Sequence, residues 1–129
     1  MDSRIAPLTV VGMEAGDVKI LRNAGARVTD DVLRTLVLAS YLLNVDRVLV
    51  MPHTECKMAS SSEAAIHAEI LERYDVDTRS MEFRTVDNQV AALQTDLDRI
   101  RAFPLLPKGL QVGGAIYDVR TGRLHIHHG

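Results

Sequence analysis

The strongest hydrophobic pattern in the chain is a helix followed by a short apolar strand. Apolar residues occupy most of the circumference of a helix predicted over 30–43, and Thr29 before two carboxylates is typical of a helix start. Because so few of its positions are polar, we expect this helix to be well buried. Residues 47–51 are β-branched and apolar, which favours a parallel strand covered on both faces. Residues 18–21 predict an earlier short strand, so the order is that of a βαβ unit.

Two more helices are predicted in the second half of the chain. One runs over about 60–74, where Ser60 and Glu63 have the spacing of a capping box. The other runs to about residue 101 after Asp87, with apolar residues at helical spacing. The polar stretch between the two helices predicts a loop.

Shorter secondary-structure elements are predicted near both ends of the chain. Residues 8–11 are apolar and predict either a short strand or a helical turn before Gly12. Residues 110–119 and 124–126 alternate like strands on either side of a tight turn, which predicts a hairpin. With no repeat and no linker, the pattern favours one α/β domain over 1–129, in which a parallel-centred sheet is flanked by helices and ends in an antiparallel hairpin.

Composition narrows the class of protein. The 129 residues carry a formal charge of −2, which leaves no general basic surface for nucleic acid or an anionic membrane. No apolar run approaches the ~18 residues of a transmembrane helix, and the first residues lack the pattern of a signal peptide. Cys56 is the one cysteine, so an internal disulfide is excluded and a cytoplasmic location fits. No glycine-rich phosphate loop is present, so nucleotide binding ranks last among the functions considered.

His53 and Cys56 are the first candidates for chemistry, because they follow the predicted strand 47–51. Open α/β sheets bind ligands at the carboxyl ends of their strands. Imidazole and thiolate are good zinc ligands, and a spacing of three residues lets both reach one ion. The alternative is structural: a small buried thiol, and a histidine hydrogen-bonded to its own loop.

Asp2 and Arg4 form a second candidate pair, since positions two apart in an extended segment face the same side. A fixed arginine can keep a carboxylate ionised and oriented beside a metal. The alternative is a frayed, solvated terminus. The other histidines favour ordinary roles: we expect His125 and His127 on one solvent face of the hairpin, and His67 as a surface or packing residue of its helix.

Taken together, several segments resemble the β-class carbonic anhydrases in order and spacing. The likeness covers essentially the whole chain, is strongest in residues 1–58, and is greatest to the short, compact members of the class. The segments that carry it are Met1-Asp2-Ser3-Arg4, Gly16-Asp17 with Arg22-Asn23-Ala24-Gly25, Val28-Thr29-Asp30-Asp31, His53-Thr54-Glu55-Cys56, and Gly114 to Asp118 with Thr121-Gly122.

The resemblance implies a zinc-dependent enzyme that hydrates carbon dioxide reversibly to bicarbonate. His53 and Cys56 would be zinc ligands, and Asp2 and Arg4 would be the catalytic pair. A metal of this kind lowers the pKa of its bound water to about 7, which supplies a nucleophile at neutral pH. Asp2 would accept a hydrogen bond from that nucleophile, and Arg4 would hold Asp2 off the metal.

The resemblance also implies a small substrate pocket and an oligomer. Asn23, Ala24 and Gly25 would line the pocket, and the class forms homodimers or higher homo-oligomers. The same metal geometry can serve hydrolysis of carbon disulfide or carbonyl sulfide on a related fold. Glu55 stands where many members have Asp, and Lys57 where many have Gly.

One departure from the family pattern concerns the metal itself. The family's first zinc-ligand cysteine, and the central strand that carries it, would come immediately before Met1. A start codon assigned too late or a shortened gene copy would each explain this. With only His53 and Cys56, zinc affinity should fall steeply, and Asp2 is the candidate third ligand. Two functions therefore stand side by side: a carbonic anhydrase with impaired activity, and a non-catalytic α/β interaction or oligomerisation module that has lost its metal.

Overall fold

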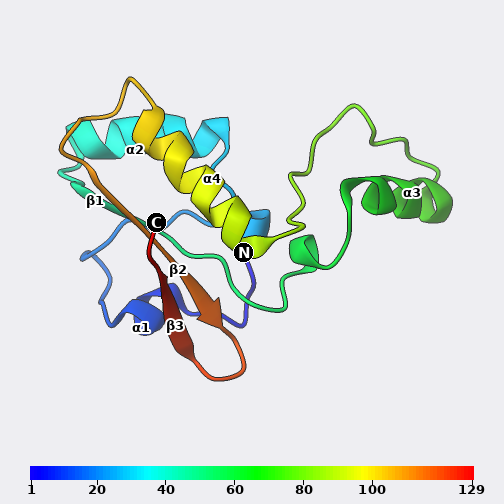
Figure 1. Ribbon diagram of the computed structural model, residues 1–129, viewed down its shortest axis with the longest axis horizontal. Helices are drawn as coiled ribbons and strands as arrows, with labels where there is room; N and C mark the ends of the chain where they lie inside the picture. Colours follow the sequence, from blue (N-terminus) through cyan, green and yellow to red (C-terminus); the bar gives the residue numbers. More distant parts are fainter.

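The computed structural model describes residues 1–129 and contains one three-stranded mixed sheet. β1 (Arg47–Val50) pairs in parallel with β2 (Gln111–Asp118), which pairs antiparallel with β3 (Arg123–His127). Figure 1 shows the hairpin formed by the last two strands, whose turn includes Gly122 at φ +72°. The α/β class, the parallel pairing of β1 and the C-terminal hairpin are therefore confirmed.

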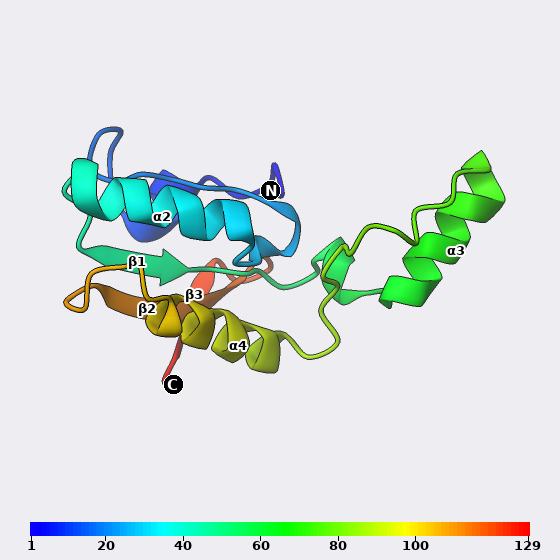
Figure 2. The same ribbon diagram turned by 90° about the horizontal axis from the view of Figure 1, so that it is seen from above.

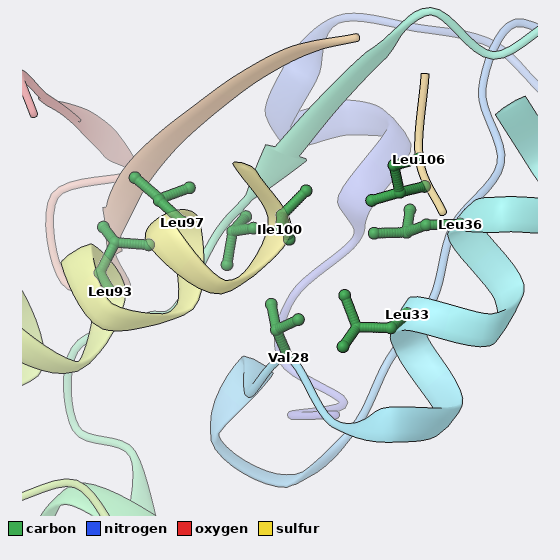
Figure 3. Packing of buried hydrophobic residues seen from close by; sticks show 8 residues of the cluster. Val28, Leu33, Leu36, Leu93, Leu97, Ile100 and Leu106 are labelled. Atoms are coloured by element: carbon green, nitrogen blue, oxygen red, sulfur yellow. The ribbon is translucent and has the colours of Figure 1, made fainter. Parts of the chain in front are cut away.

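Two helices contribute most of the buried core beside the sheet. In Figure 2 the strands β1 and β2 lie between α2 (Asp30–Leu42) and α4 (Gln89–Ala102). Their apolar side chains meet in one buried cluster with the strands (Figure 3). Its members are Val28, Leu33, Leu36, Val50, Leu93, Leu97, Ile100 and Leu106. α4 sits so close to β2 that a Cβ added at Gly114 would lie 3.0 Å from the Leu93 and Leu97 side chains.

Each of the three long helices begins after a residue whose side chain caps it, but two of the capping residues differ from those predicted. Thr29 accepts a hydrogen bond from the Val32 amide, as predicted. Ser62, rather than Ser60, caps α3 (Glu63–Tyr74), and Asn88, rather than Asp87, caps α4. In each case a neighbouring residue of equal capping ability is the one whose oxygen reaches the amide three residues ahead. Ser60 instead donates its hydroxyl to the Lys57 carbonyl.

Residues 8–11, predicted as either a strand or a helical turn, form a helical turn. α1 (Pro7–Val11) is a single short turn of helix. It starts with Pro7, whose missing amide hydrogen costs nothing at a first helical position, and ends at Gly12 in the left-handed region at φ +69°. The two remaining helical segments are the 3-10 turns η1 (Ala24–Ala26) and η2 (Lys57–Ala59).

The strand predicted at 18–21 is absent, because nothing in the chain pairs with it. These residues have no regular structure, and β1 is an edge strand that pairs with β2 alone. Both segments line one largely apolar cavity of about 610 Å³, whose wall also includes Leu36 of α2. An extended segment becomes a strand only when its backbone groups pair with a neighbouring strand. Here the cavity lies between residues 18–21 and β1, and no strand occupies it. The sheet thus lacks the central first strand that the resemblance implies.

The predicted burial of the apolar elements is only partly confirmed. Val50 faces the core, but Leu49 on the other face of β1 is 48% exposed, so the strand is not covered on both faces. Leu33 and Leu36 of α2 are buried, whereas the outer residues of that helix are not. Its exposed large residues, with the one that follows it, are Leu38, Tyr41, Leu42 and Leu43. None of the helices is long and apolar enough to cross a lipid bilayer.

α3 projects from the rest of the chain (Figures 1 and 2), and none of its residues is buried. His67 is a packing residue, as expected: its ring stacks on Phe83 with centroids 5.0 Å apart. Its Nδ1 lies 2.7 Å from the Thr78 hydroxyl and its Nε2 3.4 Å from Oε2 of Glu63, which has no hydrogen-bond partner. Through the Phe83 ring and the Thr78 hydroxyl, His67 ties α3 to the loop that follows it.

Candidate active site

The backbone places His53 beyond the carboxyl end of β1, as predicted. Residues 52–54 continue alongside β2: the Tyr117 amide donates to the Pro52 carbonyl and the Thr54 amide donates to the Tyr117 carbonyl, both at 2.9 Å. The Val119 amide then donates to the Thr54 hydroxyl at 3.0 Å. The short segment that carries His53 is thus fixed to the end of β2.

The His53 ring is held in a definite tautomer. Its Nδ1 lies 2.6 Å from the Thr54 carbonyl oxygen, and because that oxygen can only accept, Nδ1 carries the proton. The other ring nitrogen, Nε2, is the one that faces the site, and it lies 3.8 Å from Oδ2 of Asp2. Metal-binding histidines are commonly oriented in this way, with one ring nitrogen donating to a carbonyl. Gln89 further fixes the residue by donating to the His53 carbonyl at 2.7 Å.

Asp2 and Arg4 form an ordered pair rather than a frayed terminus. The Arg4 amide donates to Asp2 Oδ1 at 2.8 Å, and the Arg4 guanidinium donates to both carboxylate oxygens, the shortest contact being 2.5 Å. Arg22 donates to the Asp2 backbone carbonyl, and the Met1 amino group to the Asn23 carbonyl at 3.0 Å. These contacts bring the opening residues beside His53.

A second aspartate–arginine pair in the chain, Asp77 and Arg79, has nearly the same hydrogen bonds. Asp77 accepts hydrogen bonds from the amide and the guanidinium of Arg79 at 2.8–3.1 Å. An Asp-x-Arg sequence therefore makes this pair by itself. What distinguishes Asp2 and Arg4 is their position, beside His53 and Glu55.

Side-chain and backbone hydrogen bonds from Arg4 hold the pKa of Asp2 well below its ordinary value of 3.8. A depressed pKa means that the pair contributes stability above the ordinary value and loses it as the pH falls through the lowered one. We therefore expect Asp2 to remain ionised at pH 3, where an unperturbed aspartate is mostly protonated. In Arg4→Gln its pKa should return toward the ordinary value. Carboxyl ¹³C NMR titration measures this; the matched variant Arg79→Gln should leave Asp2 unchanged, and an Asp2 that titrates normally in the unmodified chain would contradict the pairing.

The candidate metal ligands do not form a complete site in the structure. Cys56 is buried and has no disulfide partner, and the free Nε2 of His53 suits a metal. However, no group of three histidine, cysteine, aspartate or glutamate side chains converges anywhere in the chain. Zinc sites in proteins use at least three protein ligands. The residues present fit two positions of such a site and fall short of a complete one.

Of the three residues predicted to line the substrate pocket, two line the cavity beside Asp2 and one does not. Asn23 and Ala24 line the same cavity as Asp2 and His53. Gly25 is absent from that wall; at φ +78° it allows the tight turn, and a Cβ there would lie 3.3 Å from Cβ of Met58. The Asn23 side chain is occupied within the turn, donating to the Arg27 carbonyl at 2.7 Å and accepting from its amide at 2.9 Å. Their role in a pocket stays a prediction.

Two interactions near the site were not predicted from the sequence. Asp96 of α4, 1% exposed, accepts hydrogen bonds from the Arg27 guanidinium at 2.7 and 3.1 Å and from the Val28 amide at 3.0 Å. Glu55 pairs with Arg120 of the hairpin turn at 2.5 Å. The partners are 69 and 65 positions apart, so only the fold reveals them.

The C-terminal histidines do not form a metal site. His125 is exposed, as expected, but His127 is only partly so, because its Nε2 lies 2.7 Å from Oε1 of Gln94 on α4. The expectation of a shared solvent face is therefore correct for His125 alone.

Comparison with known proteins places this geometry in a family. The profile of the carbonic anhydrase family matches residues 1–74. The chain is 30% identical over 126 residues to β-carbonic anhydrase 1 of Mycobacterium tuberculosis, covering 97% of this chain and 76% of that protein. It superposes on the crystal structure of carbonic anhydrase from Streptococcus mutans with a TM-score of 0.95 and 34% identity, covering 99% and 77% of the two chains. A carbon disulfide hydrolase of Acidithiobacillus thiooxidans is 26% identical over 150 residues, covering 99% of this chain and 74% of that protein.

The α/β fold, the histidine and cysteine that follow a parallel strand, and the aspartate–arginine pair beside that histidine agree with this likeness. The chain is a member of the β-class carbonic anhydrase family.

Proposed function

We propose that this chain carries the catalytic half-site of a zinc-dependent enzyme that hydrates carbon dioxide reversibly to bicarbonate. The observation that supports this most directly is the 3.8 Å approach of Asp2 Oδ2 to Nε2 of His53. It brings together the candidate dyad and a candidate metal ligand from residues 51 positions apart.

His53 and Cys56 would hold the zinc ion, with Asp2 as a further ligand when the site is closed. When bound, zinc supplies a nucleophile by lowering the pKa of water. The protein's own residues do the rest. Asp2, kept ionised by Arg4, accepts a hydrogen bond from the attacking oxygen and turns a lone pair of that oxygen toward the substrate carbon. Arg4 holds Asp2 in place through both carboxylate oxygens.

The substrate class rests on the family and on the apolar lining of the space beside Asp2. The cavity shared by Asp2, His53, Asn23 and Ala24 is largely apolar. Carbon dioxide is small and carries no net charge, so it suits such a wall. Carbon disulfide shares these properties, and one relative of this chain is a carbon disulfide hydrolase.

Self-association is part of the proposal. Tyr41 and Leu42 on α2 are 59% and 71% exposed, and exposed large apolar residues gathered on one helix are typical of protein interfaces. A homodimer, or a higher homo-oligomer, would remove them from water.

A different function is favoured by one observation: no three metal-ligating side chains converge in the structure. On that basis the second candidate is a non-catalytic α/β module that acts through interaction or oligomerisation.

Cobalt loading of the chain separates the two candidates. With excess Co²⁺, we expect a thiolate-to-cobalt charge-transfer absorption from the unmodified chain and its loss in Cys56→Ser and in His53→Ala, because these residues are the ligands. His67→Ala is the matched control and should retain the band. Carbon dioxide hydration with excess zinc should exceed the rate of Cys56→Ser. A chain with neither absorption nor activity would leave the interaction module as the function.

A further inference from the structure

A chain of ion pairs leads from the C-terminal hairpin to Asp2. In the turn between β2 and β3, Arg120 donates through Nε to Oε1 of Glu55 at 2.6 Å, and its Nη2 lies 2.5 Å from the same oxygen. The other oxygen of Glu55 lies 3.7 Å from Nη1 of Arg4. Arg4 in turn holds both oxygens of Asp2. Three segments that are distant in the sequence thus meet in one line of alternating charge.

The backbone fixes the end of this line that Glu55 and Arg120 form. Glu55 lies in the left-handed region at φ +55°, and the residue before it is bound to the hairpin through the Val119 amide. On the other side, Asp118 accepts a hydrogen bond from the Arg120 amide at 2.9 Å. The Glu55 carboxylate is therefore presented to Arg4 from a rigid base, although its side chain is partly exposed.

We propose that Glu55 and Arg120 are positioning residues: they hold the Arg4 guanidinium, and through it the Asp2 carboxylate, against His53. This rests on the proposed function, since a held Asp2 matters for chemistry at that site. Because 54% of the Arg4 side chain is exposed, its guanidinium can hydrogen-bond to water as well as to Asp2. A carboxylate behind its Nη1 favours the orientation in which Nε and Nη2 face Asp2.

The competing explanation is that the Glu55–Arg120 pair only fastens the hairpin. Exposed ion pairs contribute little to global stability, and the Arg120 side chain is 79% exposed. Thermal stability therefore says little about either role. The order of the Arg4 side chain is the property that separates them.

The chain contains its own reference for this measurement. Arg79 donates to both oxygens of Asp77 as Arg4 does to those of Asp2, but no second carboxylate is paired with it. In ¹⁵N relaxation of the arginine Nε–H groups, we expect Arg4 in the unmodified chain to be rigid, with an order parameter of about 0.8, and Arg79 to be lower. In Glu55→Gln and Arg120→Gln the Arg4 value should fall below about 0.6 while Arg79 stays unchanged.

A charge swap tests the role of Glu55 directly. Glu55→Arg combined with Arg120→Glu restores an ion pair between the two positions but places a cation beside Arg4, so Arg4 should remain mobile. Arg120→Lys keeps the charge and should restore part of the order lost in Arg120→Gln. An Arg4 that is equally ordered in Glu55→Gln and in the unmodified chain, or one that the swap fully re-orders, overturns the proposal. Because no metal or substrate is needed, this result stands apart from any failure of the cobalt and hydration tests.

Discussion

Adding a strand that ends in cysteine directly before Met1 should raise bound zinc from a small fraction to about one ion per chain. The added cysteine would join His53 and Cys56 as a third soft ligand, which is the number that catalytic zinc sites need. If the ~10–16 kcal/mol of a complete four-ligand zinc site is shared evenly, one ligand is worth about 3 kcal/mol, or roughly 100-fold in affinity. Carbon dioxide hydration should appear together with the metal.

The structure provides the room for such a strand. Met1 and Asp2 line the same cavity of about 610 Å³ as residues 18–21 and β1, so a segment attached to Met1 enters it directly. A strand of about five or six residues is of ordinary length. Its backbone would pair with the free edge of β1, and its apolar side chains would cover Leu49, which is now 48% exposed. The extension should therefore raise the melting temperature as well.

A matched extension separates the strand from the ligand. The same segment ending in serine fills the cavity and should raise the melting temperature equally, but it should not raise the zinc content. Zinc is measured by elemental analysis of the purified proteins, and hydration by stopped-flow with a pH indicator. Equal zinc in the cysteine and serine forms would rule out the added sulfur as a ligand. Full zinc without hydration would leave the metal site standing and exclude the carbonic anhydrase proposal for this chain.

Local chemistry made part of the fold predictable. Thr29 fixes the start of α2 because its hydroxyl accepts from an amide only three residues away. The hairpin turn could be placed because Gly122 takes a left-handed conformation that few other residues adopt. The capping assignments that failed, at Ser60 and Asp87, failed by one or two residues, since adjacent residues offered the same oxygen chemistry.

Features that depend on distant partners could not be predicted in this way. The apolar pattern of 18–21 is that of a strand, yet pairing decides the outcome, and the chain offers this segment no neighbour. At the site, the spacing of His53 and Cys56 and of Asp2 and Arg4 indicated which residues to consider. The approach of Asp2 to His53, and the pairing of Glu55 with Arg120, arise from the fold bringing separate segments together.

Replacing the buried Asp96 with alanine should cost about 3–5 kcal/mol of the free energy of unfolding, because it leaves the Arg27 guanidinium without its counter-ion. The Asp96 side chain is 2% exposed and that of Arg27 is 12% exposed, so water cannot replace the lost contacts. The Val28 amide also loses its acceptor. For a domain of this size the change corresponds to a fall in melting temperature of roughly 10–20 °C.

The chain supplies a control two residues further along the same helix. Asp98 is paired with Arg101 at 3.9 Å, but its side chain is 63% exposed, so Asp98→Ala should change stability by less than about 0.5 kcal/mol. Urea denaturation of both variants gives the comparison. Combining Asp96→Leu with Arg27→Met removes both charges and should recover much of the loss, since an apolar pair of similar volume needs no counter-ion. If Asp96→Ala proves no worse than Asp98→Ala, the buried Arg27–Asp96 pair does not hold residues 27 and 28 against α4.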